Sequence, residues 1–173
     1  MSTKRVLIFM GLVVWLSLCV CTKALAIDSE LTRKTLRGLT GVYVMVEDLQ
    51  PGFKAYAEKS GLNALQIEQN IARRIEQAGI RVLQKEVWLK TPGRPLLYVN
   101  VNTHDNKFRF AYDMKVELRQ IVVMEANPQI KTLAGTWSIN MTGIAEVNEP
   151  NVIGKNITIL VDRFINAYES ANR

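Results

Sequence analysis

The sequence predicts an α+β fold, a two-layer sandwich in which a mostly antiparallel sheet of four to five strands carries two helices on one face. Segment 108–118 alternates between an apolar face and a charged or small face, which is typical of a half-buried strand. Segments 63–78 and 153–168 repeat apolar residues at helical spacing. One face of the sheet is therefore apolar, and two amphipathic helices can cover it.

The first strand is expected within 39–49, because residues 42–46 place valines on alternate positions. Pro51 and Gly52 end this strand. We expect a loop over 53–62, part of it helical.

The most regular helix is expected at 63–78. Asn63 can cap it, and Gln66 stands three residues later, as in a capping box. Gly79 provides its C-terminal stop, and a short strand at 80–82 follows. The expected apolar face consists of Ile67, Ile71, Ile75 and Ala78.

A loop at 88–95 separates this part from three further strands. The first alternates over 97–101, and a turn at 104–107 leads into the second, 108–118. Six residues of that strand should face the helices: Phe108, Phe110, Tyr112, Met114, Val116 and Leu118. Apolar residues then occupy both faces at 121–123, which a bulge near Arg119–Gln120 would explain.

Asn127-Pro128 interrupts the pattern before the last strand, 136–142. The C-terminal helix begins after Pro150, and its buried stripe is Ile153, Ile157, Leu160, Val161, Phe164 and Tyr168. The expected element order is therefore β-α-β-β-β-β-α.

Residues 1–26 have the pattern of a secretory signal peptide. Lys4 and Arg5 precede an apolar run over 6–20, and Ala24-Leu25-Ala26 resembles a cleavage site. We expect cleavage after Ala26, a periplasmic location, and a single domain over 27–173. The apolar run is about 15 residues, shorter than the ~20 of a spanning helix, which disfavours an uncleaved anchor. A lipoprotein remains an alternative, although neither Cys19 nor Cys21 follows a small residue.

Cleavage would change the bulk properties of the chain. Both cysteines leave, so the exported protein cannot form an intramolecular disulfide. Lys4, Arg5 and Lys23 leave too, which reduces 22 basic residues to 19 against 16 acidic ones, a net charge of +3. This balance does not favour nucleic acid as a partner.

No catalytic motif is present in the sequence. His104 is the only histidine and is expected in an exposed turn, without a partner for metal binding or base catalysis. Asp113 and Glu117 lie about 13 Å apart along one strand, too far for a carboxylate pair. Glycine loops for phosphates and nucleophile elbows are absent. We therefore expect no metal and no cofactor, and the sequence favours a protein that is not an enzyme.

Two candidate binding surfaces remain. The polar face of the sheet should carry Tyr98, Asn100 and Arg109, a combination common in recognition surfaces. Its other expected members are Tyr43, Asn102, Thr136, Ser138 and Asn140. The loop bearing Phe53 and Tyr56 could close over a cleft between sheet and helix.

Three segments carry a resemblance: Gln77-Ala78-Gly79-Ile80-Arg81-Val82, Pro95-Leu96-Leu97-Tyr98-Val99-Asn100-Val101 and Thr136-Trp137. Together they resemble a pattern of small uncharacterised exported bacterial proteins, which has no assigned activity. The layout is also similar in outline to envelope assembly lipoproteins and transporter accessory proteins, by analogy of fold alone.

These observations lead to one functional hypothesis and an alternative. The first is a non-catalytic periplasmic binding or envelope-assembly accessory protein, whose partner is an envelope protein or transporter component. The alternative is a small-ligand-binding protein or enzyme with a cleft under the 53–62 loop. A deep apolar pocket with converging polar groups would favour the alternative.

Overall fold

A computed structural model describes residues 28–105 and 108–173 of the chain. The expected signal peptide and part of the 104–107 turn lie outside the described residues. The described elements are α2 (Glu30–Arg33), η1 (Lys34–Leu36), β1 (Tyr43–Val46), α3 (Pro51–Lys59), α4 (Ala64–Gln77), α5 (Lys85–Trp88), β2 (Leu96–Asp105), β3 (Arg109–Met124), β4 (Asn127–Glu146) and α6 (Asn151–Asn172).

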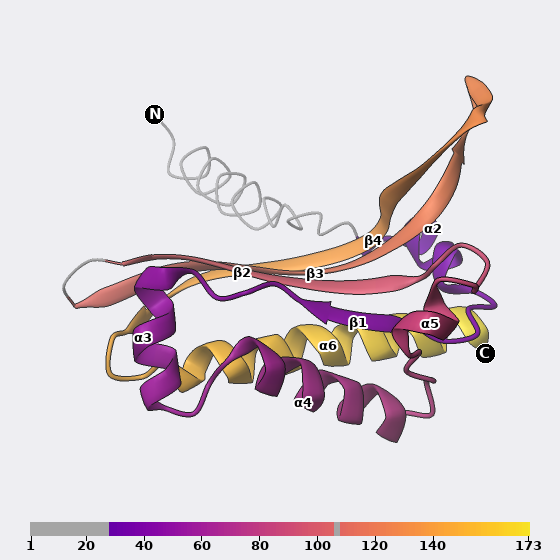
Figure 1. The fold of residues 1–173 in the computed structure, drawn as a ribbon. Coiled ribbons are helices and arrows are strands. Elements are labelled where there is room, and N and C mark those ends of the chain that lie inside the picture. Colours follow the sequence, from indigo (N-terminus) through magenta and orange to yellow (C-terminus); the bar gives the residue numbers. More distant parts are fainter. Residues whose placement is uncertain (1–27, 106–107) are drawn as a thin grey trace, which may run out of the picture.

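The α+β fold class is confirmed. The sheet has the order β1-β2-β3-β4, with β1 parallel to β2 and the other neighbours antiparallel. The long helices α4 and α6 lie side by side on one face (Figure 1). α4 packs on β1, and α6 packs on β3 and β4. We call the opposite face of the sheet, which carries no long helix among the described residues, the open face.

The core lies between the sheet and these two helices. Each strand contributes alternate residues to it, such as Leu97 and Val99 of β2 and Val116 of β3. At one end, Trp137 of β4 packs edge-on against Phe164 of α6, with ring centroids 5.5 Å apart. Trp137 Nε1 donates a hydrogen bond to Asp28 (2.9 Å), so the start of the described chain closes this end of the core.

Helix α4 begins and ends as the sequence predicts. The Asn63 side chain accepts a hydrogen bond from the Gln66 amide (2.8 Å), which caps the first turn. Gly79 follows the helix with φ of 77°, a conformation that favours glycine.

The expected loop over 53–62 is wrong for most of its length, because residues 51–59 form helix α3. Pro51 stands in the first turn, where a proline costs no hydrogen bond, so it starts this helix as well as ending the strand. Phe53 is only 1% exposed and meets Phe110 edge-on at 5.1 Å. Tyr56 meets the same ring at 5.2 Å, so this segment packs into the core.

Three smaller expectations also need correction. The strand at 80–82 is a single bridge between Val42 and Val82. The expected loop at 88–95 begins one residue later, because Trp88 is the last residue of the helical turn α5. Phe108 is 75% exposed, because β3 begins one residue later, at an end of the β2–β3 hairpin that extends past the helices (Figure 1).

Strand β4 is much longer than the expected 136–142. Asn127 is its first residue, so Asn127-Pro128 begins the strand directly after the hairpin turn. The expected bulge is confirmed by a register shift between Leu118 and Arg119. Beyond that shift the two strands leave the sheet and bend toward the open face (Figure 1). We call residues 121–135 the hairpin arm.

Candidate functional site

A buried carboxylate lies at the centre of the open face. Glu117 of β3 has a side chain only 11% exposed, and it accepts hydrogen bonds from Lys115 Nζ and Arg119 Nε, both at 2.7 Å. Burial raises the pKa of Glu117, but the two cationic donors outweigh that effect and hold the pKa below its ordinary value. Gly135 on β4 makes room for the carboxylate, since a Cβ there would overlap it.

A second group of polar residues lies beside Glu117, on β1 and β2. The Arg119 guanidinium stacks on the Tyr98 ring, 3.7 Å from its centroid. The Tyr98 hydroxyl and the Asn100 amide both donate hydrogen bonds to Glu47. The hydrogen bond from Tyr98 lowers the pKa of Glu47, and the same bond raises the pKa of Tyr98.

The hydrogen bonds continue along the face. Asn102 donates to the Asn100 side-chain oxygen (2.6 Å), and Gln50 donates to Asn102 (3.3 Å). Gln50 also accepts from the Thr103 amide (3.0 Å), which joins the segment before α3 to the sheet. These polar side chains are therefore held in place by one another, which is the property of a preorganised recognition surface.

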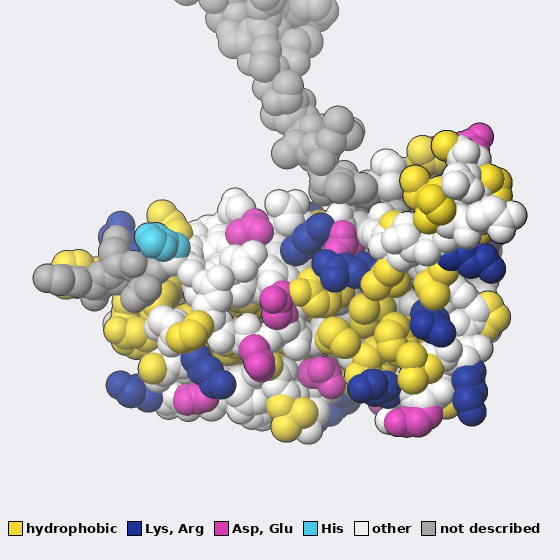
Figure 2. Space-filling model, turned by 45° about the horizontal axis from the view of Figure 1, so that its top comes forward, with side chains coloured by type: hydrophobic (Ala, Val, Ile, Leu, Met, Phe, Trp, Pro, Cys, Tyr) yellow, Lys and Arg dark blue, Asp and Glu magenta, His cyan; other side chains and the backbone are white. Residues whose placement is uncertain are grey.

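The hairpin arm adds exposed apolar side chains to this face. Val123 is 53% exposed and Leu133 is 46% exposed; Met124 and Ile130 are 45% and 49% exposed nearer the tip. Because Ile121 pairs with Leu133 and lies two residues beyond Arg119, Ile121, Val123 and Leu133 continue the side of β3 that forms the open face. Met124 and Ile130 have the opposite parity along their strands. Figure 2 shows the apolar side chains gathered on the arm.

The base of the arm is fixed by hydrogen bonds. The side-chain amide of Gln120 donates through Nε2 to Thr136 Oγ1 (2.8 Å) and to the Thr35 carbonyl of η1 (3.1 Å). The Ile121 amide donates to the Gly93 carbonyl (2.7 Å). The arm and the open face thus meet at a defined corner, which has apolar residues on one side and paired polar residues on the other.

Aromatic residues extend the apolar surface toward α5. Trp88 is half-buried and stacks on Tyr43, with ring centroids 5.1 Å apart. Its Nε1 is buried and has no hydrogen-bond partner among the described residues. Val87 and Leu89, on either side of it, are 40% and 44% exposed.

The structure separates the predicted binding residues. Tyr98 and Asn100 lie in the polar network. Arg109 is on the same face but eight residues along β3 from Glu117, roughly 26 Å away, and it forms an ion pair with Glu146 (3.0 Å). Phe53 and Tyr56 belong to the core side of the sheet.

Sequence reasoning missed two parts of this site. Strand alternation places Glu117 on the polar face of the sheet, and only the structure shows that its side chain is buried there. The arm had a signal in the apolar residues of both faces at 121–123, which we interpreted as a bulge alone.

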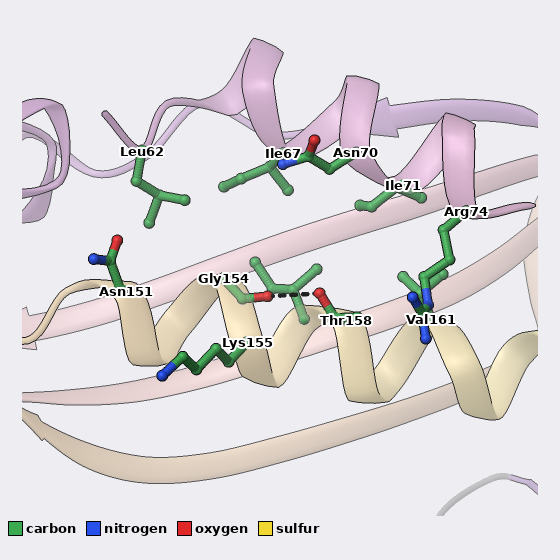
Figure 3. Close-up of a pocket in the computed structure, with 11 residues that line it drawn as sticks. Leu62, Ile67, Asn70, Ile71, Arg74, Asn151, Gly154, Lys155, Thr158 and Val161 are labelled. Carbon is green, nitrogen blue, oxygen red and sulfur yellow. Dashed lines mark hydrogen bonds between the residues drawn. The ribbon is translucent and has the colours of Figure 1, made fainter. Parts of the chain in front are cut away.

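A groove between α4 and α6 is another concave feature (Figure 3). Its volume is about 390 Å³ and its floor includes Ile67, Ile71 and Val161. Two of its polar side chains are already engaged: Arg74 pairs with Asp162, and Thr158 Oγ1 donates to the Gly154 carbonyl (3.0 Å). A further hollow of about 550 Å³ lies beside α3.

The described residues contain no group of three His, Cys, Asp or Glu side chains that could hold a metal ion. His104 lies in β2, where it pairs with Ala111. None of the described helices has the length and apolar character needed to cross a membrane. Comparison with protein families, with curated proteins and with solved structures finds no match for this chain.

Proposed function

We propose that this chain is a non-catalytic periplasmic binding protein, an accessory of envelope assembly, that docks a partner protein in the corner between the open face and the hairpin arm. The observation that carries the proposal is the arm itself. It holds Val123 and Leu133 in water at 53% and 46% exposure, on the side that continues the open face and away from the core. Clustered exposed apolar side chains with polar neighbours are typical of protein interaction sites.

The polar network supports a protein partner over a reaction. Lys115 and Arg119 neutralise Glu117, and Glu47 receives two hydrogen bonds. Carboxylates held in this way have lowered pKa values and are poor proton donors at neutral pH. They are suited to fixing the orientation of a docked surface, while the arm supplies the apolar contact.

The proposal is tested by two aspartate substitutions on the arm, Val123→Asp and Leu133→Asp. Both residues are about half exposed, so the fold should tolerate the change, whereas partner recovery from the native envelope should be lost. Leu65→Asp on α4 is the matched control, because Leu65 is 64% exposed on the opposite side of the molecule. Equal recovery of the same partner by wild type and the arm variant would contradict the proposal.

Small-ligand binding is the second candidate, and the groove between α4 and α6 favours it. Its volume of about 390 Å³ is at the lower end of ligand pockets. A ligand there would raise the melting temperature, by an amount that grows with the logarithm of the ligand concentration above the dissociation constant. Gly154→Leu would fill the groove and abolish that shift.

A further inference from the structure

The outer edge of β4 has free backbone groups along nine residues. The Val147 amide donates to the Phe108 carbonyl (3.1 Å), and hydrogen-bonded and non-hydrogen-bonded pairs alternate along an antiparallel ladder. The N–H and C=O groups of every second residue from Ser138 to Glu146 therefore point away from β3. β4 ends the sheet, so no described strand pairs with them.

The two edges of this sheet differ in how they are protected. β1 is four residues long, and Val82 bridges to the residue before it. By contrast, β4 has one charged side chain in the stretch 138–146, Glu146 at its end. Natural edge strands usually avoid pairing by being short, charged or covered. The β4 edge has none of these features between Ser138 and Ala145.

We propose that a second copy of this chain pairs with β4, antiparallel and centred on Thr142. In this register every residue whose backbone groups point outward lies opposite such a residue of the second copy. Thr142 faces Thr142 of the copy, Asn140 faces Ile144, and Ser138 faces Glu146. No like charges meet. Pairing stops at Ser138 because η1 reaches the edge there, where Thr35 Oγ1 donates to the Thr136 carbonyl (3.4 Å).

The helix layer fits the same arrangement. α6 packs on both β3 and β4. A helix centred over two strands that are ~4.8 Å apart has its axis about 2.4 Å from β4, on the side of β3. Two paired sheets would then hold their α6 helices roughly 10 Å apart, the usual distance of packed helices. The paired sheet thus brings two helices into contact as well as two edges.

An exposed apolar residue lies on the side of α6 that would meet its copy. The Asn156 side-chain amide donates to the Tyr112 hydroxyl (2.8 Å), which lies against Gly143 of β4. Ile159 follows Asn156 by three residues, on the same side of the helix, and is 45% exposed. In the paired molecule Ile159 would contact its counterpart near the two-fold axis.

The test is sedimentation velocity of the exported protein from about 1 to 100 μM. We expect a monomer–dimer equilibrium whose dissociation constant rises at least about tenfold in Thr142→Pro, because each copy loses one outward hydrogen bond. Proline is tolerated where the lost N–H faces away from the sheet. Thr142→Val keeps this N–H and should dimerise like wild type.

Two further measurements test the dimer without the Thr142→Pro variant, in case that variant fails to fold. Ile159→Glu should also weaken the dimer, since it places two like charges near the axis. Hydrogen exchange on wild type should show the amides of Asn140, Thr142 and Ile144 protected more strongly as concentration rises. A protein that remains monomeric at 100 μM overturns the proposal, as does one whose edge amides become protected only when another protein is added.

Discussion

Glu117 is the residue on which the polar network of the open face depends. The donors Lys115 and Arg119 lower its pKa in the folded state, whereas the unfolded chain has the ordinary value of 4.5. The unfolded state therefore binds more protons below this pH, so the contribution of Glu117 to stability is complete above about pH 4.5 and is lost as pH falls through the folded pKa.

This linkage is tested with Glu117→Gln. The variant should unfold with a smaller loss of stability between about pH 5 and pH 3 than wild type, measured by urea melts at each pH. Glu30→Gln is the control, because Glu30 is an exposed residue of α2 that forms no ion pair within the described part of the chain. Parallel pH curves for wild type and Glu117→Gln would show that the network contributes nothing.

Phe110 tests the register of β3. The side chain is fully buried and meets Phe53 and Tyr56 edge-on, so Phe110→Ala should cost about 3–5 kcal/mol of unfolding free energy. Arg109→Ala, on the other face, should stay within roughly 0.5 kcal/mol. Denaturant melts that give the reverse order would place the strand one residue out of register.

Residue patterns in the sequence located only part of the candidate site. Strand alternation places Tyr98 and Asn100 on the open face, because period two leaves no choice of side. Alternation also places Arg109 on that face, but it does not show which residues of the face form the network. Arg109 lies at the far end of the strand, too distant from Glu117 to take part. Phe53 and Tyr56 were placed in a loop, although their spacing of three suits a helix face.

At the level of elements, the hairpin arm is the least expected feature. The sequence predicted 108–118 and the helix at 63–78 well, because both have long, regular apolar periods and clear ends. It missed the first half of β4, since an Asn-Pro pair usually ends a strand and here begins one after a tight turn. The short bridge at Val82 depends on tertiary contact with Val42, which no local pattern shows.

The outer part of the arm, residues 123–131, can be removed without touching the core. Val122 lies directly opposite Thr132, so residues 123–131 can be replaced by Asn-Gly, which closes a two-residue hairpin. We expect a melting temperature within a few degrees of wild type, since the removed residues are largely exposed. Partner binding should be lost. A shortened protein that still binds its partner would move the site to the open face alone.

At the scale of the whole molecule, the two long helices of the described chain, α4 and α6, lie on one side of the sheet and the arm bends to the other (Figure 1). The helix side provides stability, and the opposite side keeps its polar network and apolar arm accessible. If two copies pair through β4, their open faces form one surface with an arm at each end, because the two-fold axis is then perpendicular to the sheet.

We expect the processed chain to be the form that meets the partner. Ala24 and Ala26 satisfy the small-residue requirement of a signal peptidase, so we expect the exported chain to begin at Ile27. N-terminal sequencing and intact mass of the protein from its native compartment measure this directly. A chain that retains Met1, or carries lipid on Cys19 or Cys21, would contradict the expected processing.

The central claim is that a partner protein occupies the corner between the hairpin arm and the open face. The most direct measurement is site-specific photo-crosslinking in native cells, with the reactive side chain at Val123 on the arm, at Tyr98 on the open face, or at Gln69 on the exposed side of α4 as control. The account predicts the same discrete adduct from Val123 and Tyr98 and none from Gln69. An adduct from Gln69 alone, or no adduct from either corner position, would contradict it.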